Sequence, residues 1–321
     1  MSGNDAEAEA LPRLSIVATL YHSEAYVAEF CNRAAAAASA FTGRFEIILV
    51  NDGSPDRSLE VAKQCADKHA QITIIDLSRN FGHHKAMMAG LQHSQGELVF
   101  LIDSDLEEEP EWLNEFWRSL DENRADVVYG VQVTRRGGLF ERLSGAVYYR
   151  VFRALTGLSI PSNLITARLM TRRYVAALTS FEERETDIAG LWAITGFHQV
   201  AHSVKKHSSS ATTYTLARKV NLLINSVTSF SSSPLVAIFY FGVLVSLIAM
   251  LFVCYLVIKW VFLEKPLSGW TSVMASIWLL GGLLISFVGI LGIYLAKVFS
   301  ETKRRPNTIV REIYSKSRRT H

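Results

Sequence analysis

Two aspartates separated by one serine, Asp103-Ser104-Asp105, are the residues of this chain best suited to chemistry. They directly follow the apolar run 98–102, Leu-Val-Phe-Leu-Ile, which is typical of a buried strand. Open α/β sheets bind ligands outside the carboxyl ends of their strands, so both carboxylates are expected at such an edge. Carboxylate oxygens placed there suit Mg²⁺ or Mn²⁺, with phosphate and water completing the coordination.

A simpler interpretation of the same tripeptide is an Asx turn that only ends the strand. Other phosphate-binding sequences are missing: no Gly-Xaa-Gly-Xaa-Xaa-Gly follows the first predicted strand, and no Gly-Lys-Ser/Thr occurs. Phosphate charge must then be met by a metal ion and by basic side chains, which favours the metal interpretation. His83 and His84 suit a metal less well, because adjacent residues point apart.

Strands and helices alternate in the first third of the chain. Apolar β-branched runs predict strands, and helical patterns lie between them, with turn and capping residues at 51–56. This alternation predicts an α/β domain with a mainly parallel, doubly wound sheet. The predicted strands are 14–20, 45–50, 72–77 and 98–102; the predicted helices are 24–41, one that ends near 69, and 85–94.

Two long apolar stretches near the C-terminus predict helices that cross a membrane. Residues 234–258 and 266–296 contain no charged side chain, and about 20 apolar residues suffice to cross the hydrocarbon core. Long helices of a soluble domain carry a polar face, which these stretches lack. We therefore expect transmembrane helices at 234–262 and 266–296.

The charges around these spans predict their orientation. The tail 297–321 has eight Lys or Arg and two Glu residues, which the positive-inside rule assigns to the cytoplasm. Two crossings put the domain at 13–213 on the same side. Residues 214–233 have apolar positions at helical spacing, typical either of an amphipathic helix in the membrane interface or of a helix packed on the soluble domain.

The net charge, the cysteines and the first residues indicate the partners and the compartment to expect. The formal net charge is +3, but the tail alone contributes eight minus two, or +6, so residues 1–296 carry −3 and nucleic acid is not an expected partner. The cysteines, at positions 31, 65 and 254, have no ligand-like spacing and fit a reducing compartment. We expect 1–12 to be a disordered acidic leader without the features of a signal peptide.

Five motifs follow one another in a recognisable order. They are Leu20-Tyr21-His22-Ser23-Glu24, Val50-Asn51-Asp52-Gly53-Ser54, Ser78-Arg79-Asn80-Phe81-Gly82-His83-His84, Ile102-Asp103-Ser104-Asp105-Leu106 and Thr228-Ser229-Phe230-Ser231-Ser232-Ser233-Pro234-Leu235. In these motifs the chain resembles the family 2 glycosyltransferases, and within them the polyprenyl-phosphate glycosyltransferases such as dolichyl-phosphate mannose synthase, the bactoprenol glucosyltransferases and undecaprenyl-phosphate aminoarabinose transferase. The resemblance covers nearly the whole chain, including both apolar stretches.

The resemblance implies a GT-A fold that binds a nucleotide sugar. Asp103 and Asp105 would hold Mg²⁺ or Mn²⁺ on the donor diphosphate and so assist the leaving group. Tyr21 would lie beside the base, and Asp52 would contact the base or ribose. The residues implied to bind the nucleotide are Tyr21, Glu24, Asp52, Ser54 and Asp103.

The resemblance also implies basic residues that steer an acceptor phosphate. Arg142 follows the metal motif where the family has an arginine, and Arg168 lies in a segment similar to the family's Phe-Arg-Leu-Met. Lys206 occupies a stretch where relatives carry another phosphate-binding arginine. The alternative for each is a solvated surface charge, and for Arg168 also a structural ion pair.

The acceptor implied is undecaprenyl phosphate, which is already anionic and so requires no strong general base. The function implied is the inverting transfer of one sugar from a UDP- or GDP-sugar at the cytoplasmic face of the inner membrane, for cell-envelope glycan, lipid A or O-antigen modification. Departures from the family pattern, among them Thr19, Asn51 and Thr166, leave the sugar open.

Two other functions are weighed against this one. A processive polysaccharide synthase would need a Gln-Xaa-Xaa-Arg-Trp signature and more spans, and the chain has neither. A membrane-tethered scaffold or transporter subunit with an inactive nucleotide-binding domain is the second alternative; spans without internal charges argue against transport. The glycines at 281–282, 289 and 292 would allow close helix contact, and a homo-oligomer is expected.

Overall fold

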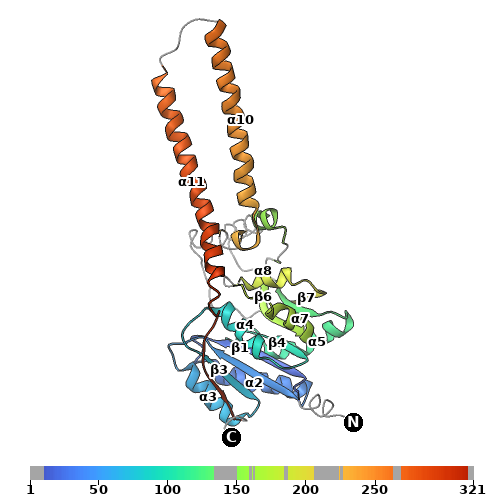
Figure 1. Ribbon diagram of the computed structural model, residues 1–321. Helices are drawn as coiled ribbons and strands as arrows, with labels where there is room; N and C mark the ends of the chain where they lie inside the picture. The colour runs from blue at the N-terminus through green and yellow to red at the C-terminus, as the bar shows by residue number, and fades with distance from the viewer. Residues whose placement is uncertain are drawn as a thin grey trace, which may run out of the picture. The chain divides into compact units, whose positions relative to one another are not determined.

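The computed structural model describes residues 11–133, 150–158, 161, 163–183, 187–205, 224, 227–262 and 269–316. The chain divides into two compact units. The first comprises Met1–Tyr149, Leu158–Tyr214 and Arg305–His321, and the second comprises Arg150–Gly157 and Thr215–Arg304. The first unit contains a mixed β-sheet with helices on both faces, and the second contains two long apolar helices (Figure 1).

The sheet has eight strands in the order β7-β5-β6-β4-β1-β2-β3-β8. Its centre, β4-β1-β2-β3, is parallel, whereas β6 pairs antiparallel with β4 and β5, and β8 pairs antiparallel with β3. The strands are β1 Leu14–Leu20, β2 Phe45–Asn51, β3 Ile72–Leu77, β4 Leu98–Leu101, β5 Val127–Gln132, β6 Leu164–Thr171, β7 Gln199–Val204 and β8 Val310–Ser315.

The central strands are buried on both faces, which explains why their sequences are continuously apolar rather than alternating. Every residue of β1 is buried. One face packs on helices α2 and α3, while α4 approaches the other face so closely that a Cβ on Gly90 would lie 2.5 Å from Val17. The helices of this unit are α2 Val27–Phe41, α3 Ser58–Lys68, α4 His83–His93, α5 Leu113–Glu122, α7 Arg172–Thr179 and α8 Ile188–Ile194, with a 3-10 turn η1 at Pro110–Trp112.

The predicted α/β fold is confirmed, and its first half follows the predicted elements within three residues. The fourth strand ends at Leu101, one residue earlier than predicted. The sequence analysis did not identify the strands that complete the sheet, β5 to β8. Strand β8 lies in the predicted basic tail and runs beside β3, where Figure 1 draws it in dark red.

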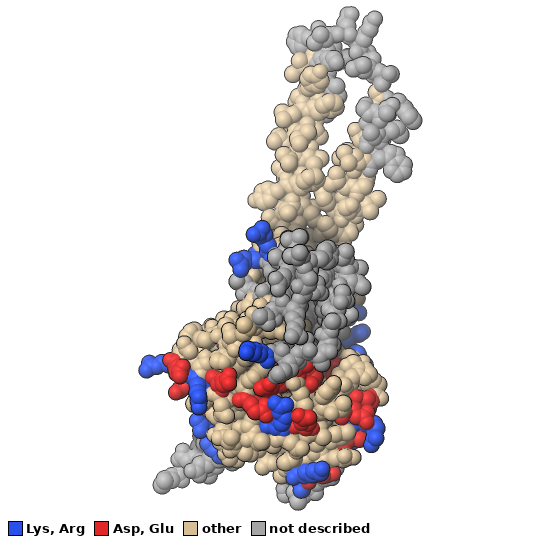
Figure 2. Space-filling view, turned by 180° about the vertical axis from the view of Figure 1, so that it is seen from behind, with Lys and Arg blue, Asp and Glu red and all other residues tan. Residues whose placement is uncertain are grey.

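The second unit contains α10, Ser233–Phe262, and α11, Trp270–Thr302. Within them, Ser233–Phe252 and Leu279–Thr302 have mean hydropathies of 2.7 and 2.3 and are long and apolar enough to cross a membrane. The drawn surface of the described helical residues is uncharged over most of its length, whereas the sheet domain carries a mixture of charges (Figure 2). Most of the predicted amphipathic helix at 214–233 lies outside the described residues.

Polar contacts join the C-terminal part of α11 to the segment just before α10. The Tyr294 hydroxyl donates to the carbonyl of Ser231 at 2.7 Å, and Nζ of Lys297 lies 2.7 Å from Oγ of Ser229. The Ser231 hydroxyl in turn donates to the carbonyl of Leu155. These contacts tie the motif Thr228-Ser229-Phe230-Ser231-Ser232 to α11, which gives that serine-rich motif a structural role.

Candidate active site

The carboxyl ends of β1, β2 and β4 lie side by side in the sheet and carry the residues singled out by the sequence. Tyr21 follows β1, Asp52 follows β2, and the Asp103-Ser104-Asp105 turn follows β4 one residue after its end. Parallel strands bring their carboxyl ends to one edge, so motifs 31 and 51 residues apart in the chain become neighbours.

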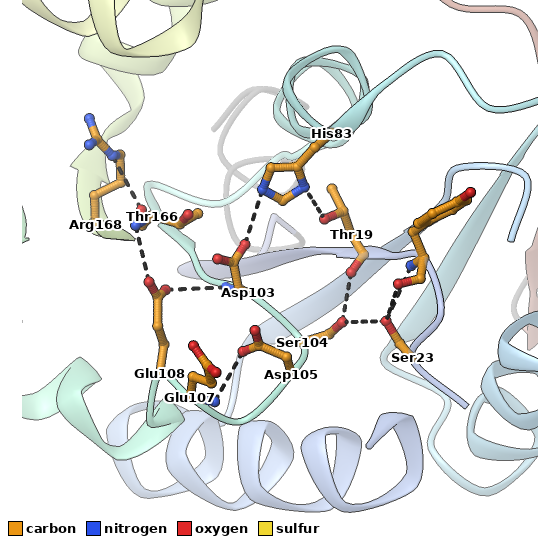
Figure 3. Close-up of polar contacts among 11 residues, drawn as sticks. Thr19, Ser23, His83, Asp103, Ser104, Asp105, Glu107, Glu108, Thr166 and Arg168 are labelled. Atoms are coloured by element: carbon orange, nitrogen blue, oxygen red, sulfur yellow. Dashed lines mark hydrogen bonds and ion pairs between the residues drawn. The ribbon is translucent and has the colours of Figure 1, made fainter. Parts of the chain in front are cut away.

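The Asp103 carboxylate lies at the centre of a group of polar contacts (Figure 3). Its Oδ1 is 3.3 Å from Nε2 of His83, and the side chain is 19% exposed. The other ring nitrogen of His83 is 3.0 Å from Oγ1 of Thr19. His83 is the first residue of α4, so the helix start holds a ring between β1 and the Asp103 turn.

The turn itself alternates between inward and outward side chains. Ser104 is buried, and its hydroxyl donates to the carbonyl of Thr19 at 2.7 Å and lies 3.2 Å from Oγ of Ser23. Asp105 is half-buried, and its Oδ1 accepts the N–H of Glu107 at 3.0 Å. The serine therefore anchors the turn to β1 and leaves the flanking carboxylates at the sheet edge.

These two carboxylates fit a hard divalent cation. Both side chains keep partial exposure and offer oxygen ligands, which Mg²⁺ and Mn²⁺ prefer. In the part of the chain that the structure describes, no group of three or more His, Cys, Asp or Glu side chains is placed to hold a metal ion. A cation at this edge would therefore take most of its ligands from a bound diphosphate and from water.

Glu108 fastens the turn to the other half of the sheet. Its side chain is fully buried, and Oε2 accepts the N–H of Asp103 at 3.4 Å while Oε1 accepts the N–H of Thr166 at 3.1 Å. A buried carboxylate needs such donors, because an unsatisfied one would be costly. Glu108 therefore joins the Asp103 turn to β6, as Figure 3 shows.

Asp52 has a different environment from Asp103. It is 2% exposed, and its two carboxylate oxygens accept the backbone N–H groups of Phe81 and Gly82 at 2.7 and 3.0 Å. Burial raises the pKa of Asp52, and the two backbone hydrogen bonds oppose that rise. The carboxylate thus holds the 78–82 loop in place; a contact between Asp52 and a nucleotide stays a prediction.

Glu24 and Ser54 both contact Asp56, the last of the turn and capping residues predicted at 51–56. The Asp56 carboxylate accepts the Ser54 hydroxyl at 2.6 Å, the Ser58 hydroxyl at 2.5 Å and the backbone N–H of Glu24 at 3.1 Å. Burial raises its pKa, but these hydrogen bonds outweigh burial and the net shift is downward. Tyr21 is 48% exposed beside this cluster, in a position open to a base.

A cleft of about 400 Å³ lies between α4, β6 and α8. Its wall combines the ring of His83 and the carboxylate of Glu108 with apolar side chains from β6 and α8. The Asp103 turn contacts the cleft through both His83 and Glu108. The described lining residues are His83, His84, Met87, Glu108, Gln132, Pro161, Leu164, Ile165, Thr166, Ile188, Ala189 and Trp192.

Of the basic residues expected at an acceptor phosphate, only Arg168 is described; Arg142 and Lys206 lie outside the described residues. Arg168 is 1% exposed, with its guanidinium over the Trp192 ring. Burial lowers its pKa, and neighbouring Tyr174 and Glu108 partly offset that effect. Arg168 thus lies behind Trp192, which lines the cleft, and its contact with a phosphate stays a prediction.

The comparisons with known proteins agree with this arrangement. The model of the family described as Glycosyl transferase family 2 matches residues 15–178. A Mycobacterium tuberculosis protein that carries a glycosyltransferase name is 51% identical over 302 residues, covering 94% of this chain and 88% of its own length. A Pseudomonas savastanoi pv. phaseolicola protein, named undecaprenyl-phosphate 4-deoxy-4-formamido-L-arabinose transferase, is 30% identical over 312 residues, covering 95% and 91%.

Among solved structures, glucosyl-3-phosphoglycerate synthase from Mycobacterium tuberculosis covers 70% of this chain and 82% of its own, with 17% identity and a TM-score of 0.49. The family match spans β1 through α7 and includes every strand end described above. The chain belongs to glycosyl transferase family 2, has the GT-A-like fold and is a glycosyltransferase.

Proposed function

We propose that this protein transfers one sugar from a nucleotide sugar to a polyprenyl phosphate, undecaprenyl phosphate, at the cytoplasmic face of a bacterial inner membrane. The reaction inverts the configuration at the anomeric carbon and depends on Mg²⁺ or Mn²⁺. The product would supply cell-envelope glycan modification, including that of lipid A or O-antigen.

The observation that carries this proposal is the extent of the similarity to the Pseudomonas savastanoi relative. The match covers 95% of this chain, so it extends over the sheet strands that precede α10 and over both apolar helices. Two apolar helices next to the catalytic domain suit a transferase whose acceptor lies in the bilayer better than one whose acceptor is soluble. A lipid-borne acceptor gives those helices a function, because it is delivered within the bilayer.

The connectivity of the chain supports the placement of the sheet domain on one side of the membrane. Strand β8 follows α11 yet belongs to the same sheet as the strands that precede α10. A chain that leaves a domain, passes through two helices and re-enters that domain must cross an even number of times. The basic residues that follow α11 favour the cytoplasmic side.

The residues at the strand ends support this proposal by the chemistry that they offer to the donor. Asp103 and Asp105 would hold the divalent cation, which when bound neutralises charge on the departing nucleoside diphosphate. The His83 ring fixes the Asp103 carboxylate from one side, and the Glu108 carboxylate fixes its backbone from the other. The exposed Tyr21 ring offers a stacking surface for the base.

The acceptor phosphate is already an anion near neutral pH, so the attack needs orientation rather than a strong base. The cleft beside His83 and Glu108 offers space next to the donor edge. Holding two charged reactants in line is worth several kcal/mol of the barrier, about 7–11 kcal/mol in well-oriented systems. Basic side chains, Arg142, Arg168 and Lys206 among them, would offset the repulsion between the two phosphates.

The test is a transfer assay with the purified full chain in detergent, undecaprenyl phosphate, Mg²⁺ or Mn²⁺, and a panel of UDP- and GDP-sugars. We expect one donor to yield a lipid-linked sugar, detected by mass spectrometry, with chelator abolishing the product. Asp105→Asn should abolish transfer while the protein stays folded. The matched control is Asp121→Asn, which changes an exposed carboxylate on α5 and should leave transfer unchanged.

Two results would overturn the proposed transfer, and a third would overturn only its dependence on a metal ion. Failure of the whole panel to yield a lipid-linked sugar, with the protein folded, would favour an inactive membrane-tethered scaffold. Elongation of a product to a polymer would favour a processive synthase. Near-normal turnover by Asp105→Asn would remove the metal role while leaving the transfer itself intact.

A further inference from the structure

Strand β8 reaches the candidate nucleotide site from the far end of the chain. It pairs with β3, and the carbonyl of Ile309 accepts the N–H of Ser78 at 2.8 Å. In this ladder Glu312 faces Asp76 and Val310 faces Leu77, so Arg311 is the extra residue at a shift in register. Such bulges redirect a side chain, and they are common next to active sites.

The redirected Arg311 side chain begins a line of contacts that ends at the nucleotide motif. Its Nη1 lies 3.3 Å from Oδ2 of Asp76, and its Nη2 donates to the carbonyl of Ser78 at 2.6 Å. Oδ1 of Asp76 accepts the Asn51 side-chain N–H at 2.7 Å, and Oδ1 of Asn51 accepts the N–H of Ser54 at 3.3 Å. One guanidinium is thus linked to the loops that follow β2 and β3.

These two loops also hold each other directly. Asp52 accepts two N–H groups from the 78–82 loop. Gly53 has φ +60°, and a Cβ there would lie 2.5 Å from the backbone nitrogen of Asn80. The loops are therefore packed backbone to backbone, so a displacement of Ser78 is transmitted to residues 52–54.

The charges of this line are mutually dependent. Asp76 is 1% exposed and Asn51 is 3% exposed, whereas the side chain of Arg311 is 56% exposed. A buried carboxylate without a cation or donors is strongly unfavourable, and Arg311 supplies the cation. An aspartate at 51 would place a second buried carboxylate beside that of Asp76, and the amide of Asn51 avoids this repulsion.

We propose that Arg311 is a positioning residue for the nucleotide site, which makes the segment after α11 part of the catalytic unit. This inference rests on the proposed function, because it assumes that the edge at 52–54 binds a nucleotide. Arg311 does not touch the reactants; it acts through Asp76, Asn51 and Ser78. Its loss is expected to weaken nucleotide binding more than it slows the chemical step.

The experiment measures binding of UDP and GDP, with Mn²⁺, to the full-length protein in detergent by isothermal titration calorimetry. The variants are Arg311→Gln, Arg311→Lys and the matched control Lys316→Gln. The control removes an exposed positive charge just after β8, whose Nζ donates to the carbonyl of Asp67. Transfer kinetics with saturating acceptor separate the donor KM from kcat.

We expect Arg311→Gln to weaken binding of the preferred nucleotide and raise the donor KM about tenfold, or about 1.4 kcal/mol, with kcat changed less than threefold. Arg311→Lys should recover part of the affinity, because it keeps a charge for Asp76. Lys316→Gln should behave as wild type. Wild-type affinity and donor KM in a folded Arg311→Gln protein would refute the positioning role.

A second variant covers the case in which Arg311→Gln does not fold. Asp76→Asn combined with Arg311→Gln removes both charges, so no buried carboxylate is left without its cation. We expect this double variant to fold and still bind the nucleotide several-fold more weakly, because the guanidinium contact to Ser78 is lost. Wild-type affinity in the double variant would overturn the inference, whereas a wild type that binds neither UDP nor GDP would count against the proposed function instead.

Discussion

The ends of β2 and β4 carry the same side chain at the same edge of one sheet, yet they differ in environment. Asp52 is almost fully buried, and both of its oxygens accept backbone N–H groups. Asp103 is partly exposed and lies against a histidine ring at the edge of a cleft. The difference teaches that Asp52 is used to hold a loop of the protein, whereas Asp103 keeps the partial exposure that a ligand would need.

The largest effect on transfer is expected at Asp103, the partly exposed aspartate after β4. Asp103→Asn should lower transfer by about a hundredfold or more, about 2.7 kcal/mol, because an amide is a weaker ligand for a divalent cation. The midpoint of thermal unfolding should stay within about 2 °C of wild type, since the side chain is not buried in the core. Initial rates and a thermal melt in detergent measure both quantities; a large fall in the melt with little loss of rate would reverse the comparison.

At Asp52, the buried aspartate after β2, a substitution should lower stability. Asp52→Asn replaces one acceptor oxygen by an NH₂ group that faces a backbone N–H, which costs about 1–3 kcal/mol. Chemical denaturation of the full chain should show that loss, together with a raised donor KM from the displaced 78–82 loop. Wild-type stability of Asp52→Asn would mean that the two backbone hydrogen bonds are not what holds this loop.

Asp56 offers a pH-dependent version of the same comparison. Hydrogen bonds hold its pKa below the ordinary value, so its stabilising contribution is complete above that ordinary value, about 3.9. Asp56→Asn should cost about 1 kcal/mol at pH 7, and the gap to wild type should shrink as the pH falls below about 4. Unfolding curves of both proteins between pH 3 and 7 measure the gap. A gap that grows on acidification would contradict this sign.

The smallest effect is expected at His83, which fixes Asp103 without holding the cation itself. His83→Ala should reduce transfer about fivefold, less than the roughly 10- to 100-fold loss that is typical when a partner of a metal ligand is removed. Stability should hardly change, because the His83 side chain is 47% exposed. A loss as large as that of Asp103→Asn would give the ring a direct part in binding or catalysis.

Many residues of the candidate nucleotide site were predictable because short stretches of sequence place them at strand ends. The run 98–102 predicts a strand, and the strand end places Asp103 and Asp105, which the structure confirms as neighbours of the β1 and β2 ends. The local sequence could also have pointed to Asp56, which lies in the turn before α3, and to His83, which begins α4. Their partners, Glu24 and Asp103, lie in the segments after β1 and β4, so these contacts follow only from the fold.

The remaining features depend on contacts between distant parts of the chain. Arg311 and Asp76 are 235 positions apart, and the segment around Arg311 looks in the sequence like a basic tail. Arg168 lies in a recognisable motif, but its burial under Trp192 depends on how α8 packs against β6. The charge of these side chains and the motifs around them could be read from the sequence, but their burial and their partners could not.

The most direct test of the central claim, that the two strand-end aspartates hold a divalent cation together with the donor diphosphate, is Mn²⁺ binding followed by electron paramagnetic resonance. The full chain is titrated with Mn²⁺ in the presence of UDP or GDP, beside Asp103→Asn combined with Asp105→Asn, and beside Asp121→Asn. We predict one nucleotide-dependent Mn²⁺ site in the wild type and in Asp121→Asn, and its loss in the double variant. An equally tight site in the double variant would contradict the claim.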